Sequence, residues 1–63
     1  MCLSKVYEVV DGAENLVCDY VSGLVIEPGY VVLTDIMGEE KKISGEIKSI
    51  DLVKNVITVS AAV

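Results

Sequence analysis

Residues 24–36 read Leu-Val-Ile-Glu-Pro-Gly-Tyr-Val-Val-Leu-Thr-Asp-Ile, and this stretch decides the fold. Two apolar runs rich in Val and Ile flank Glu27-Pro28-Gly29. Proline presets φ at the second position of a turn, and glycine accepts a positive φ at the third. β-Branched residues favour strands. The stretch therefore predicts a hairpin with a strand at 30–36, while residues 24–26 either continue an earlier strand or form a short one.

Alternating patterns and turn signals continue on both sides of this hairpin. The predicted strands are residues 3–10, 15–21, 30–36, 41–51 and 56–60, and the other turns are Asp11-Gly12, 37–40 and 53–55. Ser22-Gly23 and Gly45 mark bends, and a bulge is expected near Lys48-Ser49. Five or six short strands at this spacing predict an all-β chain, folded as a small SH3-like or Sm-like barrel in a single domain, residues 1–63.

The length of the chain, 63 residues, limits what such a barrel can do. Burial of apolar surface contributes on the order of 90 kcal/mol, and ordering the chain opposes it by roughly 95 kcal/mol. A lone core of this size is therefore marginal, and a second subunit, a metal or a disulfide would help it. The same arithmetic predicts no enclosed active site of ordinary size.

Charge and residue usage exclude several classes of function. The net charge is −5, and the chain contains neither His nor Arg. A nucleic-acid partner would be repelled. No apolar run approaches the ~18 residues of a spanning helix, so no membrane role is predicted. Residues 1–5 also lack the pattern of a signal peptide, which predicts a cytoplasmic protein with reduced cysteines.

The sequence shows no catalytic constellation, and we predict that the protein is not an enzyme. Serine and cysteine side chains lack a histidine base. The aspartates fall mostly at or near predicted strand ends, where turn chemistry and protection of strand edges explain them; they are Asp11, Asp19, Asp35 and Asp51. Glu39-Glu40 beside Lys41-Lys42 is interpreted as a solvated hairpin tip.

Cys2 is the candidate metal ligand. Removal of Met1, which is general when residue 2 is small, would place a free amine and a thiol on one residue, and the two form a five-membered chelate ring. Thiolate with amine or amide nitrogen in a plane suits Ni(II) or Cu(II) better than tetrahedral Zn(II). One residue gives too few ligands, so two chains meeting at their N-termini would double the set. The alternative is an incidental small residue. Cys18, in mid-strand, is interpreted as a small buried apolar residue.

The opening Met-Cys-Leu-Ser-Lys-Val-Tyr, residues 37–52 and the Val-rich last strand resemble the CooT family of small nickel-binding proteins. The resemblance covers essentially the whole chain. It implies a small β-barrel that binds Ni(II) through Cys2 and assists nickel supply to carbon monoxide dehydrogenase. Its implied partners are the nickel ion and that enzyme or its maturation proteins. Some members are homodimers with the metal near the interface.

Two other functions compete with this metallochaperone hypothesis. One is a non-catalytic barrel that binds a partner protein through its apolar surface, with Cys2 incidental. The other is an Sm-like RNA-binding module, a label that some related sequences carry. The charge of −5 argues against the second alternative.

Overall fold

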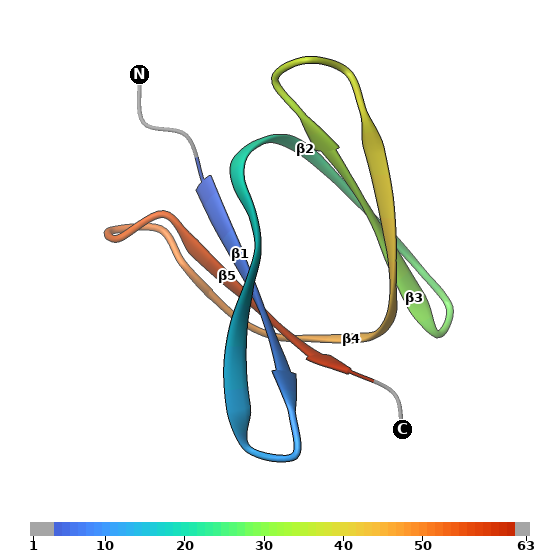
Figure 1. The fold of residues 1–63 in the computed structure, drawn as a ribbon, viewed down its shortest axis with the longest axis vertical. Coiled ribbons are helices and arrows are strands. Elements are labelled where there is room, and N and C mark those ends of the chain that lie inside the picture. The colour runs from blue at the N-terminus through green and yellow to red at the C-terminus, as the bar shows by residue number, and fades with distance from the viewer. Residues whose placement is uncertain (1–3, 62–63) are drawn as a thin grey trace.

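The computed structural model describes residues 4–61, which form five strands (Figure 1). The strands are β1 (Ser4–Val10), β2 (Ala13–Glu27), β3 (Tyr30–Asp35), β4 (Glu40–Asp51) and β5 (Val56–Ala61). They pair in sequence order and close into a barrel. The all-β small barrel is therefore confirmed. Residues 24–26 continue β2, so the described barrel has five strands rather than six.

The direction of the closing pair follows from the number of strands. The four consecutive pairs, from β1–β2 to β4–β5, are antiparallel. Four reversals return β5 to the direction of β1, so the pair that closes the barrel must be parallel. The pairing of Lys5 with Val56 and of Val9 with Ser60 runs in this parallel sense. Closure leaves neither β1 nor β5 as an open edge.

β2 and β4 bend so that each strand serves two neighbours. The first part of β2 pairs with β1 up to Val21, and the rest pairs with β3. The register shifts between Val21 and Gly23, where the Ser22 hydroxyl donates to the carbonyl oxygens of Thr34 (3.2 Å) and Asp35 (3.0 Å). β4 pairs with β3 through residue 44 and with β5 from Gly45 onward. The predicted bends at Ser22-Gly23 and Gly45 are thus confirmed as two corners of the barrel.

Gly45 is the tighter of the two corners. Its φ is +144°, a conformation that side chains rarely adopt. A Cβ atom there would overlap the Ser60 carbonyl oxygen and lie 2.9 Å from the Ala61 Cα. The Gly45 amide donates to the Gly29 carbonyl oxygen at 2.9 Å. Only glycine therefore lets the backbones of β4 and β5 approach this closely.

Register shifts between neighbouring strands set which side chains face inward. The register between β4 and β5 shifts between Ile47 and Ser49, as predicted. Two further shifts, which were not predicted, lie between β1 and β2: one between Ser4 and Val6, and one between Val6 and Tyr7, where Val6 pairs with Cys18 but Tyr7 pairs with Leu16. The extra residue sends Cys18 into the barrel and leaves Leu16 outside. No glycine or proline marks this point in the sequence, so the pattern gave no signal.

The core fills the barrel with aliphatic side chains and one thiol, and every strand contributes to it. Its buried apolar members are Val6, Cys18, Val21, Val31, Leu33, Ile43 and Val59. Val17, Leu24, Ile47 and Ile57 pack against them. Cys18 is a free thiol, 9% exposed, as its interpretation as a core residue predicted. The core leaves the ends and the outer face of the barrel to carry any function.

Candidate functional site

The end of the barrel at which β1 begins is the candidate functional site. Cys2, the predicted metal ligand, lies outside the described residues. The first described residue, Ser4, pairs with Val21 of β2, and the Lys5 amide donates to the Asn55 carbonyl oxygen at 2.9 Å. We call this end the β1 rim and define it as Ser4, Lys5, Tyr20 and the loops 36–39 and 52–55.

The loop 36–39 closes one side of the β1 rim around Asp35. The Asp35 Oδ1 accepts hydrogen bonds from the amides of Met37 (2.9 Å) and Glu39 (3.0 Å). The backbone adds a bond from Gly38 to the Asp35 carbonyl oxygen and one from Ile36 to that of Tyr20, each 3.0 Å long. Gly38 has a φ of +85°. The Asp35 carboxylate thus fixes the turn, and the Ile36 amide ties the turn to β2.

The loop 52–55 repeats this construction on the other side. The Asp51 Oδ1 accepts bonds from the amides of Val53 (3.0 Å) and Lys54 (2.9 Å). Asn55 has a positive φ of +57° in this loop, as Gly38 has a positive φ in the first loop. Figure 1 shows this β4–β5 turn beside the start of β1, with the β3–β4 turn beyond β2. The interpretation of Asp35 and Asp51 as turn residues is confirmed.

Both loops hold aliphatic side chains in solvent. Met37 is 85% exposed, Leu52 83% and Val53 92%, and Ile36 and Tyr20 are exposed by more than half. Single exposed apolar residues are ordinary, but each of these two loops exposes an adjacent pair, Ile36-Met37 and Leu52-Val53, which makes each loop a candidate contact surface for another molecule. These residues were not predicted as functional from the sequence. The signal was present, because Asp35-Ile36-Met37 and Asp51-Leu52-Val53 are the same pattern of one aspartate and two apolar residues.

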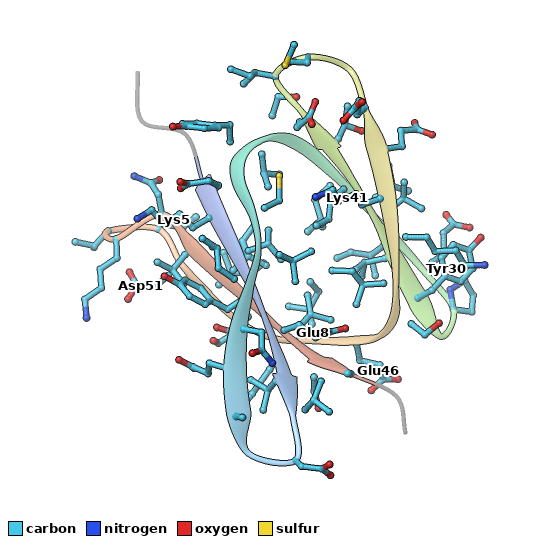
Figure 2. All side chains as sticks on the ribbon, in the orientation of Figure 1. Lys5, Glu8, Tyr30, Lys41, Glu46 and Asp51 are labelled. Atoms are coloured by element: carbon cyan, nitrogen blue, oxygen red, sulfur yellow. The ribbon has the colours of Figure 1, made fainter. Side chains whose placement is uncertain are left out.

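A surface groove opens beside the loop 36–39. Its volume is about 360 Å³, and its lining includes Cys18, Tyr20, Met37 and Lys41. The Lys41 ammonium crosses the groove and donates to the Val17 carbonyl oxygen at 3.2 Å, from β4 to β2 (Figure 2). β2 and β4 do not pair with each other, so this hydrogen bond links two strands that are not neighbours in the barrel.

The described donors near the β1 rim do not assemble into a metal centre. Residues 4–61 contain no group of three or more Cys, Asp or Glu side chains that could hold a metal ion. Asp35 and Asp51 bind loop amides. Asp19 lies within β2 rather than at a strand end, contrary to its interpretation, and pairs with the Lys5 ammonium at 3.9 Å. The ion pair with Lys5 on the neighbouring strand, and not turn chemistry, therefore explains Asp19.

Comparisons with known proteins identify the class to which this barrel belongs. It is a small closed barrel with exposed apolar side chains on two loops and a surface groove beside one of them. The family model for CooT, the CO dehydrogenase accessory protein, matches residues 1–60. The chain belongs to the CooT family of CO dehydrogenase accessory proteins.

A solved structure supports the same assignment. The crystal structure of a protein assigned as CooT from Carboxydothermus hydrogenoformans superposes with a TM-score of 0.84 at 26% sequence identity. The alignment covers 98% of this chain and 100% of that one. No curated protein sequence matches the chain. Within residues 4–61, no helix has the length and hydropathy needed to cross a membrane.

Proposed function

We propose that this protein is a nickel carrier that binds Ni(II) through the Cys2 thiolate and supplies it to carbon monoxide dehydrogenase in the cytoplasm. The observation that carries the proposal is the family match, which begins at residue 1 and so includes Cys2. Ni(II) is the cargo of the protein, which acts as a carrier and not as a catalyst. Loss of the thiol proton on binding makes the thiolate the effective ligand.

The donor set of the β1 rim supports a shared site. Cys18 carries the only thiol among the described residues, and its side chain is buried in the core, 9% exposed. The carboxylates of Asp19, Asp35 and Asp51 are hard ligands, and each already has a partner. Ni(II) in a planar thiolate and nitrogen set needs more donors than one Cys2 supplies. A second copy of the chain brings a second Cys2.

The exposed side chains of the β1 rim support a homodimer with that arrangement. Met37 and Leu52 stand out on loops that are already fixed by Asp35 and Asp51, so covering them costs little ordering entropy. A 63-residue barrel also gains from a second subunit, because its own core is small. Two chains that meet rim to rim bring the starts of their β1 strands together.

A nickel titration tests the carrier function. The protein is first weighed intact by mass spectrometry, which reports whether Met1 is present, and Ni(II) is then titrated into it. We expect the parent and Cys18→Ala to bind nickel alike, and Cys2→Ala to lose binding by at least about a hundredfold. A Cys2→Ala variant that binds as tightly as the parent contradicts the proposal. Native mass spectrometry of the same samples reports whether nickel and dimer appear together.

The exposed loops also favour the second candidate, a protein-interaction barrel in which Cys2 is incidental. The two functions differ in the effect of nickel on stability. A ligand that binds only the folded state stabilises it by about 2.7 kcal/mol at one hundred times its Kd. The carrier therefore melts at a higher temperature in saturating nickel, whereas the interaction barrel melts at the same temperature with and without the metal.

A further inference from the structure

The outside of the barrel carries an ordered apolar and acidic surface distinct from the β1 rim loops. The ladders place three rows of side chains there: Glu14, Val9, Ser60 and Glu46; Leu16, Tyr7, Thr58 and Ser49; and Lys5, Val56 and Asp51. These rows alternate with the buried Val6 and Val59, so they face outward. We call them the outer sheet face.

The centre of the outer sheet face is apolar and already packed. Tyr7, Val9 and Val56 are half-buried, and Leu16 is 50% exposed. Thr58 faces outward yet is only 7% exposed, so its neighbours on the face cover it. The apolar side chains therefore form one patch held by adjacent strands. A continuous patch of this kind, unlike scattered single residues, marks an interaction surface.

Carboxylates frame this patch. Glu14 lies on β2, opposite Val9. Glu46 and Asp51 lie at the two ends of the β4 segment that pairs with β5 (Figure 2). Asp19 adds a fourth carboxylate, which pairs with Lys5 at 3.9 Å. Lys48, in the bulge before Ser49, borders the face.

The balance of charge on this side is negative. Four framing carboxylates outnumber the two lysines, Lys5 and Lys48, and the sequence has no lysine between residues 6 and 40. A second copy would present the same acidic frame and would be repelled. A basic partner would be attracted, and charge complementarity would orient it on the face.

We propose that the outer sheet face docks a basic surface of carbon monoxide dehydrogenase, with an apolar side chain of the enzyme seated over Tyr7 and Leu16. This inference rests on the proposed function, because it takes the enzyme as the receiver of the nickel. The placement suits delivery, since the row that contains Lys5 belongs both to this face and to the β1 rim. A docked enzyme would lie beside the start of β1.

Association kinetics with nickel-free carbon monoxide dehydrogenase test the docking face. Glu14→Lys/Glu46→Lys reverses two charges of the frame, and Glu27→Lys/Glu40→Lys makes the same change in net charge at exposed positions off the face. Long-range attraction speeds association and weakens with salt. We expect the first variant to associate at least about tenfold more slowly, with a flatter salt dependence, and the second to stay within about threefold of the parent.

The apolar centre is tested by dissociation. Leu16→Ser removes a side chain that is 50% exposed, and Val25→Ser makes a similar change at 53% exposure, away from the outer sheet face. Packing contacts act mainly on dissociation rates. We expect Leu16→Ser to dissociate about tenfold faster and Val25→Ser to match the parent. Circular dichroism confirms that each variant is folded.

Three results would overturn this docking face. They are equal association rates for the two charge variants, no binding of the enzyme by the parent, or a change in the sedimentation mass of Glu14→Lys/Glu46→Lys that shows a self-association surface instead. Nickel titration of that variant separates the two proposals. If Glu14→Lys/Glu46→Lys binds nickel as the parent does and also associates with the enzyme at the parent's rate, only the docking face is overturned. If Cys2→Ala binds nickel as tightly as the parent, the carrier function is overturned.

Discussion

The β1 rim and the outer sheet face present apolar side chains by different means. On the β1 rim, single carboxylates, Asp35 and Asp51, hold loop amides and leave Met37 and Leu52 standing in solvent. On the outer sheet face, ladder hydrogen bonds set Tyr7 and its neighbours side by side. The loops can be altered one at a time, while the face depends on the register of four strand segments. The β1 rim is therefore suited to assembly between chains, whereas the outer sheet face is part of the strand pairing that holds the barrel together.

The largest effect is expected at Gly45, the corner where β4 leaves β3 and begins to pair with β5 on the outer sheet face. Substitution by Ala drives a Cβ atom into Ser60 and forces a φ of +144° on a side chain. Overpacking costs about 1–3 kcal/mol and such a backbone about 1–3 kcal/mol more. That sum approaches the whole stability of a domain this small. We expect Gly45→Ala to be largely unfolded in circular dichroism and urea denaturation.

Gly38→Ala is the matched control for that corner. Gly38 also has a positive φ, +85°, but a Cβ atom there meets nothing within 4 Å. We expect it to lose about 1 kcal/mol and to keep the outer sheet face intact. Equal loss of stability in the two variants would show that backbone conformation, and not the crowding at Ser60, governs the corner.

Most of the fold follows from local signals that the sequence displays. Pro28-Gly29 marks the turn between β2 and β3, and Gly29 takes the positive φ, +82°, that this predicts. Asp11-Gly12 likewise takes two positive φ angles, +50° and +80°, as a tight hairpin requires. Gly45 announces its bend because a backbone approach excludes any side chain. Each of these signals arises within the few residues of a turn, or from a steric restriction that only glycine satisfies.

The outer sheet face could not be predicted in this way. Its rows depend on the bulge at Val17, which places Leu16 outside and Cys18 inside, and no residue type signals that bulge. Asp19 shows the same limit, since its partner, Lys5, is distant in sequence and meets it only when β1 and β2 pair. The candidate ligand Cys2 was predicted from its chemistry and from the family resemblance, and it lies outside the described residues, so that prediction stays open to the nickel titration.

The next largest effect is expected on assembly through the β1 rim. Leu52→Ser/Val53→Ser changes side chains that are 83% and 92% exposed, so the stability of one chain should fall by less than about 0.5 kcal/mol. If a second copy covers them, the lost burial is about 2 kcal/mol, or a roughly thirtyfold weaker dimer. Sedimentation equilibrium with nickel present measures this change.

Val25→Ser/Ile26→Ser provides the comparison for the β1 rim. These side chains are 53% and 61% exposed on the β2–β3 hairpin, outside the rim. We expect this double variant to dimerise with the same dissociation constant as the parent. Equal weakening by both double variants would mean that exposed apolar area in general, and not the β1 rim, drives self-association.

The smallest effect isolates the carboxylates that distinguish the β1 rim from the outer sheet face. Asp35→Ala removes the acceptor of two amide bonds, from Met37 (2.9 Å) and Glu39 (3.0 Å), at an exposed loop where water replaces part of the loss. We expect about 1 kcal/mol less stability and faster amide exchange at Met37 and Glu39. Amides of β1 and β5, which the ladder holds, should exchange as in the parent. Asp35→Asn keeps an acceptor oxygen and should restore most of the protection. Faster exchange spread evenly over the loop and the outer sheet face would mean that the two surfaces form one cooperative unit, and their different construction would then have no consequence for how each can be changed.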